Sequence, residues 1–137
     1  MSRRVFFDAN VLFTAAYSPG GKASTLIEEA DRIGIVLVTS PLALEEARWN
    51  LAAKAPQAVP RLETLARGFQ LAKLVQGSCP LKLPAKDQPI FLAALASGAN
   101  VLLTGDRKDF GRYMEKPART QGVLIVTVAR FLEEYLG

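Results

Sequence analysis

The stretch that decides the fold is RVFFDANVL, residues 4–12, near the amino terminus. It begins with a short, continuously apolar run, which is typical of a strand buried on both faces of a sheet. Asp8 and Asn10 interrupt the run at the point where such a strand would end. A secretory signal peptide needs about 7–15 uninterrupted apolar residues, so these two polar side chains argue against one. The stretch therefore predicts a buried strand with a carboxylate at its carboxyl end.

Further apolar runs of strand length alternate with helical patterns along the chain. Strands are predicted at residues 3–7, 35–39, 100–104 and 122–127, and helices at residues 22–32, 40–54, 56–74, 87–98 and 128–136. Residues 76–86 are predicted to form a loop or an edge strand, and residues 105–111 a polar turn. This alternation predicts an α/β sandwich around a mainly parallel sheet. With 137 residues, the chain is expected to form a single domain over residues 1–137.

The composition excludes several classes of function. Half of the residues are apolar, but no run approaches the roughly 18 apolar residues of a membrane span, so we expect a soluble cytoplasmic protein without membrane association. The single cysteine, Cys79, cannot form an internal disulfide and suits a reducing compartment. There is no histidine, which excludes Ser-His-Asp catalysis and every imidazole metal site. A metal site would need oxygen ligands, which favour Mg²⁺ or Mn²⁺.

The charge balance is modestly basic, with 17 Lys and Arg against 13 Asp and Glu and a net charge of +4. If several of the carboxylates shared one metal pocket, the remaining surface would be strongly basic. A basic surface around an acidic, metal-binding pocket suits a phosphodiester substrate. An ordinary basic globular protein is the alternative until the acids are placed.

The carboxylates gather where the predicted strands end. In open parallel sheets, ligands bind outside the carboxyl ends of the strands. The acidic residues expected near this edge are Asp8, Asp87, Asp106 and Asp109, together with Glu45 or Glu46. Adjacent residues of a helix point about 100° apart, so only one of the two glutamates is expected to face the site.

Each acid also has a local interpretation. Asp8 and Asp87 could be helix N-caps, Asp106 and Asp109 could be turn residues, and Glu45 and Glu46 could be solvated. One shared cause explains the whole set more simply than separate local causes. Crowded carboxylates repel one another and need a compensating cation.

Three segments together resemble the PIN domain, a compact metal-dependent ribonuclease fold: FFDANVL (6–12), SPLALEEARWNL (40–51) and KDQPIFLAALASGANVLLTGDRKDF (86–110). The resemblance covers residues 5–131 in order and spacing. It implies a three-layer α/β/α sandwich around a parallel sheet of about five strands.

The resemblance also implies roles for individual residues. Catalytic acids would be Asp8, Glu46, Asp87 and Asp106, with Glu45 as the second choice for the glutamate, and metal ligands would be Asp8, Asp87, Asp106 and Asp109. Asn10 and Thr104 would support these carboxylates, and Arg107 and Lys108 could contact substrate phosphates. The family further implies RNA as substrate, Mg²⁺ or Mn²⁺ as cofactor, a homodimer, and the role of toxin in a type II (VapBC-like) toxin–antitoxin pair with a small antitoxin partner.

Two other functions are weighed against this one. A haloacid-dehalogenase-like phosphatase also places an aspartate after its first strand, but it needs a second aspartate two residues later, where this chain has Asn10. A non-catalytic module that binds RNA or protein is the other alternative, and the full set of acids argues against it. Trp49 could stack on a base, although at its position in a helix it fits a core or a partner interface better.

Overall fold

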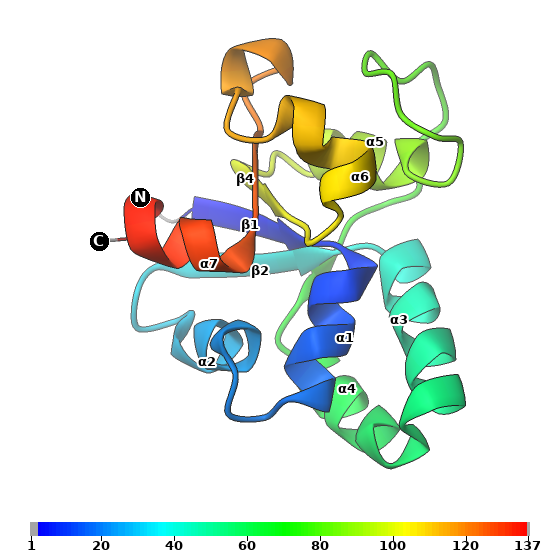
Figure 1. Cartoon of the computed structure of the whole chain (residues 1–137), viewed down its shortest axis with the longest axis vertical. Coiled ribbons are helices and arrows are strands. Elements are labelled where there is room, and N and C mark those ends of the chain that lie inside the picture. Colours follow the sequence, from blue (N-terminus) through cyan, green and yellow to red (C-terminus); the bar gives the residue numbers. More distant parts are fainter. Residues whose placement is uncertain (1–2, 137) are drawn as a thin grey trace.

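The computed structural model describes residues 3–136, and its centre is a five-stranded sheet, with helices packed around it (Figure 1). The strands are β1 (Arg3–Phe7), β2 (Ile35–Thr39), β3 (Gln70–Leu71), β4 (Val101–Leu103) and β5 (Leu124–Val126), in the spatial order β3-β2-β1-β4-β5. Every pair of neighbouring strands is parallel. The predicted α/β fold with a parallel sheet of about five strands is confirmed.

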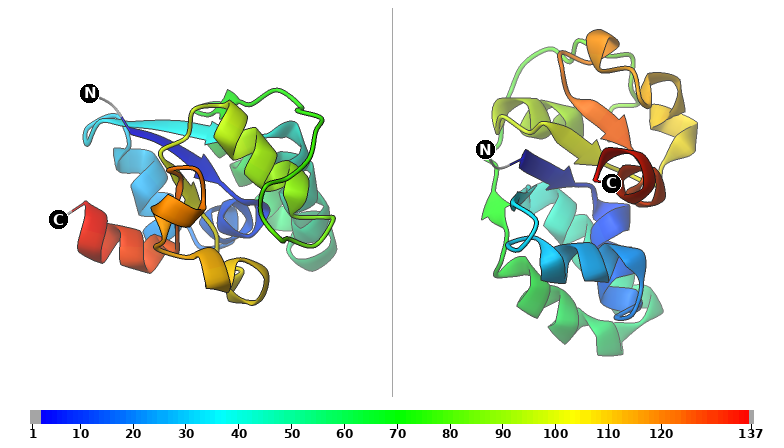
Figure 2. Two further views of the ribbon diagram at one scale, coloured as in Figure 1. Left: turned by 90° about the horizontal axis from the view of Figure 1, so that it is seen from above. Right: turned by 90° about the vertical axis from the view of Figure 1, so that its left-hand side faces the viewer.

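Helices cover both faces of the sheet (Figures 1 and 2). They are α1 (Ala9–Tyr17), α2 (Lys22–Glu29), α3 (Pro41–Lys54), α4 (Val59–Ala66), α5 (Gln88–Ala96), α6 (Arg107–Phe110) and α7 (Val128–Arg130). Three 3₁₀ turns (Pro56–Ala58, Gly111–Tyr113 and Pro117–Arg119) and a π-helical turn (Phe131–Tyr135) complete the elements. Helices α1, α2 and α4 lie on one side of the sheet and α5 on the other. Within residues 3–136, no helix combines the length and the apolar character needed to cross a membrane.

The central strand β1 sets the register of the sheet. Phe6 lies opposite Val38 of β2 and Leu102 of β4, and all three side chains are completely buried. Parallel strands that are covered on both faces are continuously apolar, because no side of the strand meets water. The carboxyl ends of β1, β2 and β4 therefore lie at one edge of the sheet, where polar residues follow each strand.

The prediction of one long helix over residues 56–74 is wrong. Helix α4 ends at Ala66, and Gln70–Leu71 form the edge strand β3 instead. The ring of Phe69 is buried and packs edge-on against Phe7, with 5.0 Å between the ring centroids. The amide of Ala72 donates to the carbonyl of Thr39 at 2.7 Å. Packing against the sheet thus overrides the local helical pattern, and residues 76–86 form the loop that follows.

Smaller differences from the predictions lie at the ends of the elements. Helix α2 ends at Glu29 rather than at Arg32, and a turn leads to Gly34, whose positive φ of 76° suits a glycine. The predicted polar turn at residues 105–111 contains the short helix α6, because Asp106 caps it by accepting a hydrogen bond from the amide of Asp109.

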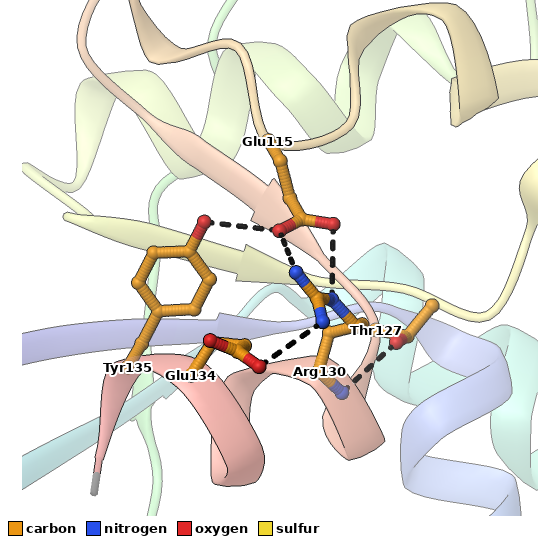
Figure 3. Close-up of polar contacts among 5 residues, drawn as sticks. All are labelled: Glu115, Thr127, Arg130, Glu134 and Tyr135. Atoms are coloured by element: carbon orange, nitrogen blue, oxygen red, sulfur yellow. Dashed lines mark hydrogen bonds and ion pairs between the residues drawn. The ribbon is translucent and has the colours of Figure 1, made fainter.

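A polar network fastens the carboxyl-terminal helical segment to the loop before β5 (Figure 3). Arg130 forms ion pairs with Glu115 at 2.9 Å and with Glu134 at 3.3 Å. The hydroxyl of Tyr135 donates to the same Glu115 carboxylate at 3.0 Å. Because these groups are solvent-accessible, the network orients the segment while buried residues such as Phe131 supply most of the packing energy.

Candidate functional site

Asp8 follows β1 and starts α1, so two elements fix its position. Its amide donates to the carbonyl of Leu103 in β4 at 3.0 Å, and its carbonyl accepts from the amides of Val11 and Leu12 in α1. One carboxylate oxygen, Oδ1, accepts from the amide of Ala9 at 2.7 Å, so Asp8 does cap the helix. The other oxygen, Oδ2, remains directed at the polar edge of the sheet, where other side chains contact it.

Asn10 and Thr104 hold this second oxygen of Asp8. The Thr104 hydroxyl donates to Asp8 Oδ2 at 2.8 Å, and the Asn10 side-chain amide donates to the same oxygen at 3.3 Å. The amide of Gly105 donates to Asn10 Oδ1 at 2.8 Å, and the amide of Asp106 donates to the Thr104 hydroxyl at 3.1 Å. The supporting contacts expected for Asn10 and Thr104 are therefore present, and they connect Asp8 to the chain that carries Asp106.

The surroundings of Asp8 make its carboxylate unusually basic. Burial raises its pKa, and the hydrogen bonds from Thr104 and from the amide of Ala9 oppose that rise. The negative charges of Glu46 and Asp106 raise the pKa further, so both lie close enough to act on Asp8. A cation bound at this edge would oppose the effect of both negative charges and lower the pKa of Asp8.

Three aspartates form a tight cluster on the loop after β4 and at the start of α5. Carboxylate oxygens of Asp87, Asp106 and Asp109 all lie within 4.8 Å of one another. Lys86 pairs with Asp109 at 3.5 Å. Asp87 directly precedes α5, yet its side chain does not cap the helix, and its buried Oδ2 atom has no hydrogen-bond partner within residues 3–136.

The cluster shifts the protonation of its members in opposite directions. Burial raises the pKa of Asp87 to about 7, and the close approach of the Asp109 carboxylate raises it as well. The same interaction with Asp87 lowers the pKa of Asp109. The pair therefore keeps one proton near neutral pH, as expected for carboxylates too close to be ionised together.

The structure distinguishes Glu46 from Glu45. A cavity of about 740 Å³ opens at the edge of the sheet, and its lining includes Glu46, Asn10 and Asp106. Glu45 points elsewhere and lies 3.8 Å from Arg48. The rotation of α3 decides this, because Ala43, Leu44, Ala47 and Leu51 form its buried face.

The cations at the cavity differ from those expected. Lys22, at the start of α2, and Lys86, just before Asp87, both line the 740 Å³ cavity. Arg107 and Lys108 are exposed on α6 and do not line it. Lys86 had a signal in the sequence, since it is adjacent to a predicted site acid, whereas Lys22 is brought in only by the packing of α2 against α1.

The chemistry of the edge fits a divalent cation. Its donors are carboxylate, amide and hydroxyl oxygens, which are the ligands that Mg²⁺ and Mn²⁺ prefer. The unpartnered Oδ2 atom of Asp87 and the close approach of three carboxylates both call for a positive charge. The residues present therefore fit a metal of this class.

The parallel five-stranded sheet, covered by helices and with carboxylates beyond the ends of its strands, has the architecture of the PIN-type sandwich, and two solved structures share its fold. The first is the structure of VapBC2 from Rickettsia felis, which is bound to a DNA fragment from the VapBC2 promoter. One of its chains superimposes on this protein with a TM-score of 0.62. It is 15% identical, and the match covers 89% of this chain and 96% of the other. A chain of VapBC-1 from nontypeable Haemophilus influenzae superimposes with a TM-score of 0.58, at 16% identity, over 92% of this chain and 98% of the other.

The protein thus has the PIN-type fold of VapC, which is the fold that its sequence motifs implied. At these identities the likeness concerns the fold. No family model matches the sequence, and no curated protein matches it either.

Proposed function

We propose that the protein is a metal-dependent endoribonuclease. The observation that carries the proposal is the cluster of Asp87, Asp106 and Asp109, whose carboxylate oxygens lie within 4.8 Å of one another. Asp8 is buried, and it lies close enough to Asp106 for the negative charge of Asp106 to raise the pKa of Asp8. Neither a core nor an ordinary surface requires so many carboxylates in one place, since unpaired they destabilise the fold.

The residues would divide the work between metal binding and support. Asp8, Asp87, Asp106 and Asp109 would hold Mg²⁺ or Mn²⁺, which when bound supplies an activated water and charge stabilisation for phosphodiester hydrolysis. Asn10 and Thr104 would fix the orientation of Asp8 through the hydrogen bonds described above.

The groups along the cavity would position the substrate. Glu46 would orient a water molecule beside the scissile phosphate or accept its proton, because it lines the same cavity as Asp106. Lys22 and Lys86 would hold the phosphate from the rim. Arg107 and Lys108 remain proposed contacts for the flanking backbone, since both are exposed next to the acids.

The biological role we propose is that of the toxin in a toxin–antitoxin pair, with a small antitoxin as partner. The likeness to VapBC structures supports this role. A test is to express the chain in bacteria with and without the product of the neighbouring reading frame. Growth arrest that this product relieves is the expected result, and the arrest should be absent for Asp8→Asn.

We also propose that the chain forms a homodimer. Leu42, Trp49 and Leu74 are 46%, 73% and 76% exposed, and Leu42 and Leu74 line one recess next to α3. Exposed apolar groups of this size suit a protein interface. Sedimentation of the wild type beside Leu74→Lys tests the proposal, and an unchanged monomer in both samples would contradict it.

The nuclease activity can be tested directly. Purified protein is incubated with single-stranded and structured RNA in Mg²⁺ or Mn²⁺, and with EDTA. We expect cleavage that EDTA abolishes and that Asp8→Asn and Asp106→Asn reduce by about a hundredfold or more. Asp31→Asn, at an exposed aspartate in the turn before β2, is the matched control and should retain full activity.

The same assay separates the alternatives. Turnover of p-nitrophenyl phosphate without RNA cleavage would favour a phosphatase. RNA cleavage that survives both EDTA and Asp8→Asn would overturn the proposed mechanism. RNA binding without any hydrolysis would instead favour the non-catalytic module.

A further inference from the structure

The cavity at the acids continues into a second one between α1 and α3. The second cavity has a volume of about 580 Å³ and shares Asn10, Thr14 and Glu46 with the first. Away from the acids it is lined by Phe13 of α1 and by residues of α3. The two cavities therefore form one groove that starts at Asp106, a member of the three-aspartate cluster, and follows the seam where α1 packs on α3.

Both walls of this extension follow from helix periodicity. On α3, Glu46, Asn50 and Lys54 are spaced four residues apart and share one face. On α1, Phe13 and Thr14 follow Asn10 by three and four residues and line the cavity together with it. The extension is thus a continuous surface built by two packed helices, and its volume lies in the range of ligand sites.

The chemistry of the extension is that of a nucleotide site rather than a metal site. Lys54 supplies a cation that forms no ion pair within residues 3–136. Asn50 supplies an amide with both a donor and an acceptor. Phe13 is half-buried, and its ring stacks on Tyr17 with 5.6 Å between the centroids, which fixes the plane of the ring.

We propose that this extension binds one nucleotide of a single-stranded nucleic acid next to the phosphate placed at the acids. Phe13 stacks on the base, Asn50 hydrogen-bonds its edge, and Lys54 pairs with the adjacent phosphate. Single strands are favoured because a paired base cannot leave its neighbours to stack on a side chain. The inference rests on the proposed nuclease function, and it names the strand type and the binding site for the flanking nucleotide.

Trp49 provides the matched comparison for Phe13. It is the aromatic side chain of α3 and is 73% exposed, but it lines a neighbouring recess with Arg48, Ala52 and Ala53 rather than the groove itself. Lys73 is the comparison for Lys54, since it lines the apolar recess beside Leu42 and Leu74. Neither residue contributes to the groove that contains the acids.

The test compares a long and a short substrate in the full chain. The test variants are Phe13→Leu, Lys54→Gln and Lys54→Arg. Phe13→Leu keeps an apolar side chain but removes the aromatic ring. The controls are Trp49→Leu and Lys73→Gln. For a single-stranded hexaribonucleotide we expect Phe13→Leu and Lys54→Gln to raise KM about tenfold. For bis(p-nitrophenyl) phosphate, which occupies only the first cavity, kcat and KM should stay within about twofold. Lys54→Arg should behave as the wild type.

Binding measurements make the result independent of turnover. Fluorescence anisotropy of the labelled hexaribonucleotide, with Ca²⁺ in place of Mg²⁺, should show weaker binding for Phe13→Leu and Lys54→Gln only. Lys54→Gln should also reduce the salt dependence of binding by about 0.7 in the log–log slope, as expected for one lost phosphate contact on a single strand. Duplex RNA should bind Phe13→Leu and the wild type equally.

The outcomes separate this inference from the nuclease proposal. Hydrolysis of both substrates by the wild type, with unchanged KM and affinity in Phe13→Leu and Lys54→Gln, would overturn the inference and leave the nuclease function standing. An equal loss of affinity in the controls, or an equal loss for duplex RNA in Phe13→Leu, would also overturn it. Selective loss of single-strand binding in a protein without hydrolysis would support the nucleotide site and refute the nuclease.

Discussion

The buried carboxyl group of Asp87 should give the metal-free protein an unusual dependence of stability on pH. Its pKa is raised from 3.8 to about 7, chiefly by burial. A carboxyl group whose pKa is raised on folding contributes stability that is full below its unfolded pKa and is lost as pH rises through the folded one. In EDTA, the free energy of unfolding should therefore fall between about pH 4 and pH 7.

The size of the fall follows from the length of this interval. Each pH unit over which the folded chain holds one extra proton is worth about 1.4 kcal/mol, so the roughly three units between the unfolded and the folded pKa correspond to about 4 kcal/mol. Solvent in the neighbouring cavity screens the charges of the cluster, so we expect about 2 kcal/mol. The lowered pKa of Asp109 adds no slope here, because its contribution is lost only as pH falls through lower values.

Asp87→Asn removes the titrating group and should remove the fall. Urea unfolding followed by far-ultraviolet circular dichroism at several pH values measures both proteins, with Asp31→Asn as the exposed control. Near pH 7 the variant should be more stable than the metal-free wild type by about 2 kcal/mol, because the repulsion is gone. Mg²⁺ should stabilise the wild type near pH 7 and have little effect on the variant. A flat profile in the wild type, or the same fall in Asp87→Asn, would refute this reasoning.

Three further substitutions test other parts of the structure. Thr104→Val removes the 2.8 Å hydrogen bond to Asp8 and should lower the free energy of unfolding by about 1–2 kcal/mol. Thr25→Val, at an exposed position, is the control, and an equal effect in both variants would show that this hydrogen bond does not stabilise the fold. Phe91→Ala empties a completely buried position and should cost about 3–5 kcal/mol, against less than about 0.5 for the exposed Trp49→Ala. Arg130→Gln should slightly lower the melting temperature at low ionic strength, and the difference from the wild type should vanish near 1 M salt, where exposed ion pairs are screened.

The main features of the sheet could be predicted because buried parallel strands leave a strong local signal. Strands β1, β2, β4 and β5 are short apolar runs flanked by polar residues, and each was expected within a few residues of its observed bounds. Strand β3 could not be predicted in this way. It consists of Gln70 and Leu71 only, both exposed, and it pairs with β2 because Phe69 packs on Phe7.

The residues of the candidate site also differ in how well the sequence predicts their positions. Acids that lie within three residues of the end of a strand, such as Asp8 after β1 and Asp106 after β4, are placed by the strand and could be assigned to the edge from the sequence. The side of the site contributed by helices depends on rotation and packing. Helix geometry alone left Glu45 and Glu46 open, although the family resemblance favoured Glu46, and Lys22 and Phe13 needed the structure. Asp87 looked like an N-cap, but burial among other acids gives it a different environment.

Asn10 connects Asp8 to the loop after β4, and the hydrogen bonds that it forms there require a side-chain amide. It donates to Asp8 Oδ2 and accepts from the amide of Gly105, so the position needs a donor and an acceptor on one short side chain. A carboxylate could accept from Gly105 but could not donate to Asp8, and it would add a negative charge beside a carboxylate whose pKa is already raised. The aspartate that a phosphatase requires at this position would therefore disrupt the network that holds Asp8. Because Asn10 also lines both cavities, one side chain ties the support of Asp8 to the groove proposed for the substrate.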